Sequence, residues 1–301
     1  MPVNPVYLLV ATSAFFWGAN FVLAAPVLSD IQPLWAAAFR FVLGGALMLS
    51  LALFQGHELF SLARRHAATY LLLGLIGIAA FNLFFFRAME TTSADNGALI
   101  MATNPLLTTL LGLALLGERV SSRQLIALPI ALIGVAVVIS HGHLSRLSGI
   151  RVAQGDMLML GANLTWALFN VFSRRYMPNA APTANTALMM TAGAVILLFA
   201  AVTSGSHLSF PGTRATLALV VMAVGGTVLA YLFWGMGIKQ LGAGKTSLFL
   251  NLVPVFAMLL GGVTGALPTA SQALGGLIVL ASVTIAMMPS KFSPGPVSPR
   301  S

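Results

Sequence analysis

Amide side chains inside apolar segments are the first candidates in this sequence for binding a small molecule. Six asparagines lie within such segments: Asn20, Asn82, Asn104, Asn163, Asn170 and Asn251. An amide that faced lipid would lose its hydrogen bonds, so each of these must face protein or water. A hydrogen bond between two helices would explain any one of them. Taken together, they indicate a neutral polar lining.

Aromatic residues at similar depth extend this candidate site. Trp17 shares a helix face with Asn20, and Trp166 shares one with Asn170, because the spacings are three and four residues. Tryptophan usually lies at the membrane surface, so a deep tryptophan has another role, either plain helix packing or binding. The full set predicts a site for a substrate with an apolar body and a few hydrogen-bonding groups. Its members are Trp17, Asn20, Asn82, Phe85, Met101, Asn163, Trp166, Asn170, Tyr231 and Trp234.

Arg40 is the one charged residue predicted within an apolar segment. It follows Pro33, where a helix is predicted to begin, by about 10 Å along the helix axis, which places it in the outer third of the membrane. One interpretation pairs Arg40 with an outer carboxylate (Asp30, Glu90 or Asp95) or turns it toward the surface. The other is that Arg40 attracts a substrate carboxylate in an outer vestibule.

Carboxylates and imidazoles are predicted to be absent from the middle of the membrane. The six acidic residues and the five histidines all fall at segment ends or in loops. Proton relays and ion-coupling sites are usually marked by such groups. Their positions argue against a carboxylate-coupled antiporter, an intramembrane protease and a metalloenzyme, so no catalytic residue, metal or cofactor is predicted. The sequence also lacks the phosphate-binding loop of an ATPase.

Long apolar segments must position these residues. Of the 301 residues, 58% are hydrophobic and 7% are charged, whereas a soluble domain carries about 25% charged residues. Lipid must therefore cover most of the surface, and about 20 apolar residues suffice for one crossing. The net charge of +9 is spread over short loops, which argues against a nucleic-acid partner. Transmembrane helices are predicted over 7–27, 34–54, 68–89, 94–116, 123–140, 156–173, 183–203, 215–237, 243–265 and 270–288.

An internal repeat organises these segments. A constant offset of 149 residues relates Trp17 to Trp166, Pro33 to Pro182, and Pro105 to Pro254. Each half has five predicted helices, an odd number, so the second half would enter the membrane from the opposite side. The predicted fold is an all-α integral membrane protein whose ten helices form two inverted five-helix repeats around a central cavity. The repeats span 1–145 and 150–290, and a disordered cytoplasmic tail follows over 291–301.

Two prolines within the predicted helices are candidate hinges. Pro105 and Pro254 occupy equivalent positions in the two repeats, and each removes one helical hydrogen bond. They either act as hinges for alternating access or only shape the cavity.

The distribution of basic residues predicts the orientation. With the N-terminus in the cytoplasm, ten lysines and arginines lie on the inner side and four on the outer side. Cytoplasmic loops carry an excess of such residues. Both termini are therefore predicted to be cytoplasmic.

The sequence resembles the EamA-type exporters of the drug/metabolite transporter superfamily, over essentially the whole chain. Within that group it is most similar to the YddG-like amino-acid exporters. The second half lacks the acidic residue that often follows the proline-containing helix in this family. The matching motifs are FWGANFV at 16–22, LWAAAFRF at 34–41, NPL at 104–106, LGER at 116–119 and LVPVF at 252–256.

The resemblance implies a secondary transporter of the bacterial inner membrane that exports neutral or aromatic amino acids or related metabolites. It implies no particular energy source. A multidrug exporter of cationic compounds is an alternative, although cation efflux usually needs an intramembrane acidic residue. A non-transporting receptor or a membrane enzyme is an alternative of another class. The expected partners are the lipid bilayer and a small substrate, and the expected state is a monomer or a weak dimer.

Overall fold

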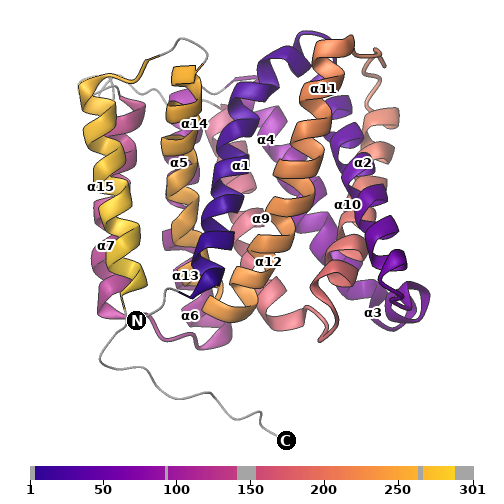
Figure 1. The fold of residues 1–301 in the computed structure, drawn as a ribbon, viewed down its shortest axis with the longest axis horizontal. Coiled ribbons are helices and arrows are strands. Elements are labelled where there is room, and N and C mark those ends of the chain that lie inside the picture. The colour runs from indigo at the N-terminus through magenta and orange to yellow at the C-terminus, as the bar shows by residue number, and fades with distance from the viewer. Residues whose placement is uncertain (1–3, 92–93, 141–153, 264–266, 289–301) are drawn as a thin grey trace, which may run out of the picture.

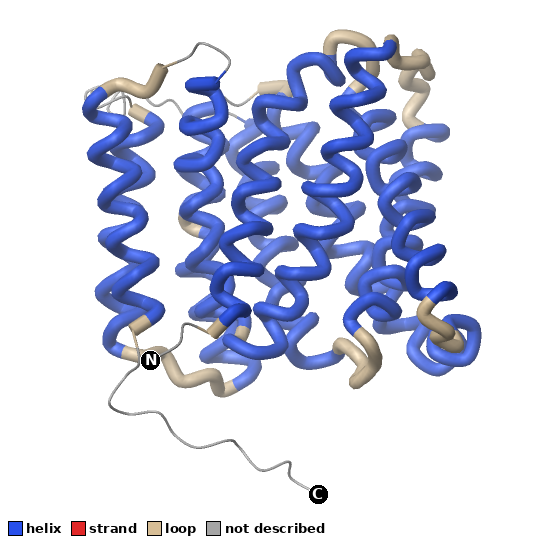
Figure 2. The backbone as a smooth tube through the Cα atoms, viewed as in Figure 1, coloured by secondary structure: helices blue, strands red, loops and turns tan. Residues whose placement is uncertain are grey.

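The computed structural model describes residues 4–91, 94–140, 154–263 and 267–288. Within these ranges the chain is helical and contains no strand (Figure 2). Seven helical runs of the described residues are long and apolar enough to cross a membrane. They are Pro5–Leu28, Pro33–Phe54, Leu59–Met89, Pro182–Thr203, Thr213–Leu241, Ala243–Gly262 and Ala270–Met287, with shorter apolar helices at Ile100–Leu116 and Ser122–Val138. The predicted tail over 291–301 lies outside the described residues.

The elements lie side by side as a bundle of rods (Figure 1). The first half contains α1 (Pro5–Leu28), α2 (Pro33–Phe54), α3 (Leu59–Gly74), the π-helix η1 (Leu75–Ala80), α4 (Phe81–Met89), α5 (Ala94–Ala102), α6 (Asn104–Leu116) and α7 (Ser122–Ile139). The second half contains α9 (Gln154–Tyr176), α10 (Pro182–Thr203), α11 (Thr213–Val221), the π-helix η2 (Met222–Leu229), α12 (Ala230–Leu241), α13 (Ala243–Ser247), the 3₁₀-helix η3 (Leu248–Asn251), α14 (Leu252–Val263) and α15 (Ala270–Met287).

The helix predicted over 68–89 begins earlier, at Leu59. The added segment carries Arg64, Arg65 and His66, so an apolar window excludes it. At His66 the backbone leaves helical geometry (φ −126°, ψ 25°), which separates this basic turn from the apolar part of α3. The prediction therefore located the apolar part of the helix and missed its polar start.

Local signals explain where several helices begin. α2 and α10 are each 22 residues long and start on Pro33 and Pro182, where the missing N–H costs no helical bond. α7 and α15 are each 18 residues long and start with a capping box. In this motif the side-chain oxygen of the capping residue accepts the backbone N–H three residues on, and the glutamine there accepts the backbone N–H of the capping residue. The capping residues are Ser121 with Gln124, and Thr269 with Gln272.

Two helix pairs flank the bundle, α7 with α15 at one edge and α2 with α10 at the other (Figure 1). Gly134 and Gly275 allow the first pair to approach closely, because a Cβ on Gly134 would lie 2.9 Å from the Gly275 carbonyl oxygen. Between the edges, α1 packs on η2, α12 and α14, while α9 packs on η1, α4 and α6. Each half therefore places its first helix against the third and fourth helical rods of the other.

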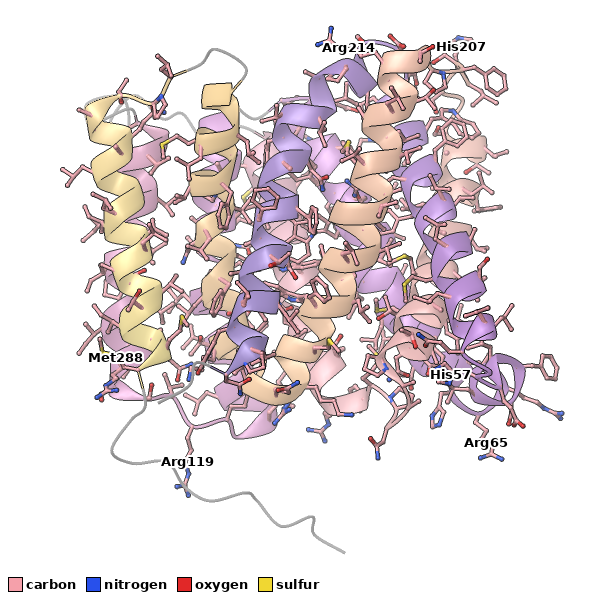
Figure 3. The ribbon with its side chains drawn as sticks, viewed as in Figure 1. His57, Arg65, Arg119, His207, Arg214 and Met288 are labelled. Carbon is pink, nitrogen blue, oxygen red and sulfur yellow. The ribbon has the colours of Figure 1, made fainter. Side chains whose placement is uncertain are left out.

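The two ends of the bundle are identified by residues labelled in Figure 3. Figure 3 places Arg65 and Arg119, together with Met288 at the end of α15, at one end, and Arg214 at the other. We call these the Arg119 end and the Arg214 end. α3 lies toward the Arg119 end and α4 toward the Arg214 end, whereas α11 and α12 run in the reverse order (Figure 1).

Candidate functional site

Four aromatic rings from both halves meet where α1, α9 and α12 cross. The ring centroid of Trp17 lies 5.4 Å from that of Trp166, 4.9 Å from that of Trp234 and 6.0 Å from that of Tyr231. The Trp166 and Tyr231 centroids are 5.7 Å apart. These separations are those of favourable edge-to-face and offset aromatic pairs. Trp17, Trp166, Tyr231 and Trp234, which the sequence placed at similar depth, thus form one cluster. We call it the aromatic cluster.

The cluster is bonded to the π-helices. The Trp17 indole Nε1–H donates to the Gly226 carbonyl at 2.9 Å, and the Tyr231 hydroxyl donates to the Gly77 carbonyl at 3.1 Å. Both glycines lie within a π-helix. Such turns shift the helical hydrogen-bond pattern and are frequent at functional sites. Hydropathy does not report that pattern, so the sequence did not predict the π-helices.

Trp234 is the most buried member of the cluster, with 0% of its surface exposed. Its indole N–H donates to the Asn170 side-chain oxygen at 2.8 Å. Asn170 therefore orients Trp234, while its own amide nitrogen is buried and has no hydrogen-bond partner.

Three further polar atoms next to the cluster are buried without a hydrogen-bond partner. They are the indole nitrogen of Trp166, the side-chain oxygen of Asn20 and Nε of Arg40. Asn20 lies against Gly226, beside the bond that Trp17 makes. Buried polar groups without partners are few in native proteins, and each one needs an explanation. With the Asn170 nitrogen, four such atoms of the described residues lie around one set of rings.

Arg40 does not pair with Asp30 or Glu90, two of the three carboxylates that the sequence suggested. Asp30 accepts a backbone N–H at 2.9 Å instead. Glu90 pairs with Arg87 at 3.2 Å, and the side chain of Asp95 lies outside the described residues. No carboxylate of the described part of the chain forms an ion pair with Arg40. The reason is geometric, since Asp30 and Glu90 are engaged close to their own helix ends.

Arg40 instead lies beside the aromatic cluster. Its guanidinium carbon is 4.8 Å from the ring centroid of Phe41, and that ring is 5.7 Å from Tyr231. The guanidinium and the Tyr231 hydroxyl are close enough to interact electrostatically. Protein surrounds the guanidinium, while the residue as a whole is half-buried.

Phe85, Met101 and Asn82 lie outside the aromatic cluster. Phe81 joins them to the cluster, with its ring 5.3 Å from Trp166 and 5.9 Å from Phe85. Phe85 and Met101 pack together beside a small group of buried apolar residues. The Asn82 amide nitrogen donates to a carbonyl of its own helix at 2.6 Å and is held there.

Asn163 belongs to a separate polar network between α6 and α9. Its amide nitrogen donates to the Ile100 carbonyl at 2.8 Å and to the Thr103 hydroxyl at 2.9 Å. Its side-chain oxygen accepts from Asn104 at 2.6 Å, and Asn104 in turn accepts from Thr108 at 3.0 Å. These buried amides therefore hold two helices together.

We expect Asn163→Ala to destabilise the protein. The change removes the bonds that the Asn163 amide makes to Asn104, Ile100 and Thr103, and leaves the Asn104 amide only the Asn163 backbone carbonyl; losing buried bonds of this kind costs about 1–3 kcal/mol. The apparent Tm of the purified protein in detergent should fall by a few degrees. Leu164→Ala is the matched control, because Leu164 is 43% exposed and lies outside this network. An unchanged Tm for Asn163→Ala would contradict a structural role for this amide.

The hinge candidates stand at helix breaks. Pro105 is the second residue of α6, directly after the break at Thr103, and Pro254 is the third residue of α14, directly after η3. Asn251 ends η3 and is 2% exposed. Both of its side-chain polar atoms lack a hydrogen-bond partner. The sequence pointed to the amide but not to the break beside it.

Glu118 connects helix ends at the Arg119 end. Its carboxylate accepts the backbone N–H of Ala243 at 3.1 Å and that of Gly244 at 3.4 Å. Arg174 lies 3.9 Å from the same carboxylate and donates to the Ile238 carbonyl at 3.2 Å. We call this set the Glu118 network. It joins the end of α6 to α9, α12 and α13. The sequence alone favours a capping or surface-pair role for Glu118 but does not identify these partners, because they lie in the other half.

Two hollows lie at the ends of the bundle, away from the aromatic cluster. One, of about 320 Å³, lies at the Arg214 end against Asp30 and Arg214. The other, of about 380 Å³, lies at the opposite end against His57, Arg65 and Asn179. In the aromatic cluster itself the rings pack on one another, with Trp166 4% and Tyr231 6% exposed.

Known proteins resemble this chain over nearly its whole length. The sequence profile of the EamA-like transporter family matches residues 4–140 and 153–288. An uncharacterized transporter of Bacillus subtilis, YyaM, is 35% identical over 93% of both chains. A probable amino-acid metabolite efflux pump of Escherichia coli is 27% identical, covering 89% of this chain and 88% of its own. One crystal structure superposes with a TM-score of 0.80 at 20% identity, covering 95% of this chain and 97% of the other.

Proposed function

Since the chain belongs to the EamA-like transporter family, an exporter group of the drug/metabolite transporters, we propose that it exports neutral or aromatic amino acids or related metabolites. It is a multi-pass membrane transporter whose helical runs are long enough to span lipid. Export would proceed by alternating access, in which the two halves move against each other around a central site. A relative named as a probable amino-acid metabolite efflux pump supports this cargo class.

We propose that the helical rods are ten crossings in two inverted repeats, 1–145 and 150–290, around a cavity that opens in turn to each side. Equal lengths of α2 and α10, and π-helices at equivalent places, support the repeat. The reversed order of α3–α4 and α11–α12 between the two ends supports the inversion (Figure 1). Breaks before Pro105 and Pro254 would serve as the hinges.

The observation that carries the proposal is the aromatic cluster between the halves. Rings of Trp17, Trp166, Tyr231 and Trp234 would hold an apolar side chain, with Phe85 and Met101 beyond them. Asn20 and Asn170 would bond the polar groups of the cargo, because each keeps an unpartnered atom there. Asn82 and Asn163 would position the surrounding helices.

The proposed setting is the bacterial inner membrane, with both termini in the cytoplasm. Arg65 and Arg119 at one end support this orientation, because cytoplasmic loops are enriched in arginine (Figure 3). The Arg119 end would then be the cytoplasmic end. A monomer or a weak dimer would suffice, since the proposed site lies within one chain.

Counterflow in proteoliposomes tests the proposal. Vesicles loaded with one unlabelled amino acid should accumulate the labelled form transiently, with no ion gradient or ATP present. Phenylalanine, tyrosine, tryptophan, leucine and methionine form the first set. Trp17→Ala should abolish the signal, while the control Trp35→Ala should retain it, because Trp35 lies at the start of α2. Absence of counterflow across this set would contradict amino-acid export.

A further inference from the structure

The unpartnered atoms around the aromatic cluster are mostly donors. Trp166 offers an indole N–H, Asn170 an amide N–H and Arg40 the N–H of its guanidinium, whereas Asn20 offers an oxygen acceptor. A buried donor without a partner costs about 1–3 kcal/mol, and more when it is charged. A ligand that supplies acceptors for these donors would therefore gain the most.

Arg40 adds a positive charge without a counter-ion in the described part of the chain. An ionisable residue within a membrane segment is costly, so it usually has a functional partner. Guanidinium binds a carboxylate through parallel N–H bonds. The interaction with Tyr231 places this charge next to the rings that would hold the apolar body of the cargo.

A difference between the repeats leaves the Trp166 donor free. In one repeat the Trp17 indole donates to the carbonyl of Gly226. The equivalent carbonyl for Trp166 is that of Gly77, 149 positions before Gly226. The Tyr231 hydroxyl bonds that carbonyl, and the Trp166 indole has no partner. The donor of Trp166 therefore stays available, whereas that of Trp17 is used.

We infer that the cargo is selected through a carboxylate, which Arg40 and the Trp166 indole N–H bind while the apolar body packs on the aromatic cluster. This inference rests on the proposed function and narrows its substrate class. A free ammonium group is then optional, since only the Asn20 oxygen and the ring faces would meet it. Aromatic or branched monocarboxylates without an amine should therefore be cargo, and the corresponding amines should not.

Three ligands that share one ring test the inference: L-phenylalanine, 3-phenylpropionate and phenethylamine. The wild-type protein is assayed twice, for thermal stabilisation by each ligand in detergent and for counterflow of labelled phenylalanine with each as competitor. We expect the concentration of 3-phenylpropionate that halves the counterflow signal to lie within about tenfold of that of phenylalanine. The corresponding concentration of phenethylamine should be at least about tenfold higher than that of 3-phenylpropionate. Arg40→Gln should weaken the binding of phenylalanine about tenfold, and Arg40→Lys should weaken that binding less. The control Arg214→Gln removes an exposed charge at the Arg214 end.

The outcomes separate the two claims. Equal competition by the amine and the acid, or full affinity in folded Arg40→Gln protein, overturns the carboxylate site. Stabilisation by the two carboxylates without counterflow supports that site and overturns the exporter. If Arg40→Gln does not fold, the comparison of the three ligands on wild-type protein still decides. If none of the three ligands stabilises the protein and none gives or inhibits counterflow, both claims are overturned.

Discussion

Glu118→Gln is expected to open the Arg119 end and to raise the labelling of a buried position there about tenfold. The carboxylate holds two backbone N–H groups of α13 and lies 3.9 Å from Arg174. A hydrogen bond to a charged group contributes about 1.5–3 kcal/mol, and about 1.4 kcal/mol corresponds to a tenfold change in population. Losing the charge therefore favours the conformation in which α6 and α13 separate.

The measurement uses a single cysteine, because the chain contains none of its own. Ser173→Cys places it on α9 beside Arg174, at a position only 5% exposed. A membrane-impermeant maleimide then reports access from the Arg119 end. Arg119→Gln is the matched control, since it removes a neighbouring charge that is exposed at the surface. Equal labelling in both variants would contradict a closing role for the Glu118 network.

The two halves of the chain differ at the Glu118 network. The position equivalent to Glu118 is Leu267, and the position equivalent to Arg174 is Ala25. The Arg214 end therefore cannot build the same network from its equivalent residues. It carries the hollow of about 320 Å³ against Asp30 instead. At the Arg214 end the Asp30 carboxylate accepts one backbone N–H, that of Gly212. Glu118 accepts two and lies near Arg174, and this larger set would favour closure of the Arg119 end while the cargo is absent.

Most of the helical layout could be predicted from the sequence, because hydropathy reports which segments avoid water. The ranges 34–54 and 183–203 fall within one residue of α2 and α10. Hydrogen-bond register is a different property, so η1 and η2 had no signal in the apolar pattern. The break at Thr103 likewise interrupts the range predicted as one helix over 94–116, two residues before its proline.

The candidate site was predictable in depth but not in hydrogen bonding. Trp17, Trp166 and Trp234 were grouped by depth and lie together in the structure. Asn163 was grouped with them by the same criterion and shares a helix face with Trp166, yet its amide bonds Asn104 in a separate network. Neighbouring helices decide which side chains bond to one another, and that information lies in the tertiary packing.

Tyr231→Phe is expected to weaken cargo binding about tenfold although the hydroxyl itself need not touch the cargo. Its removal leaves the Gly77 carbonyl without the side-chain donor that bonds it at 3.1 Å. The Trp166 indole N–H can then donate to that carbonyl, as Trp17 does to its own repeat equivalent. One donor is lost to the cargo, and a hydrogen bond to a charged carboxylate contributes about 1.5–3 kcal/mol. The concentration for half-maximal counterflow of phenylalanine measures the effect.

A double-mutant cycle separates this mechanism from general loosening of the site. In a Trp166→Phe background the indole donor is already absent, so Tyr231→Phe should add little further loss of affinity. Tyr70→Phe is the matched control: it removes another buried hydroxyl, bonded to Asn185 at 2.6 Å and outside the aromatic cluster. That variant should lower the Tm and leave the affinity unchanged. Additive losses in the cycle would show that Tyr231 acts independently of Trp166, and the symmetry-breaking role assigned to Tyr231 would then be wrong.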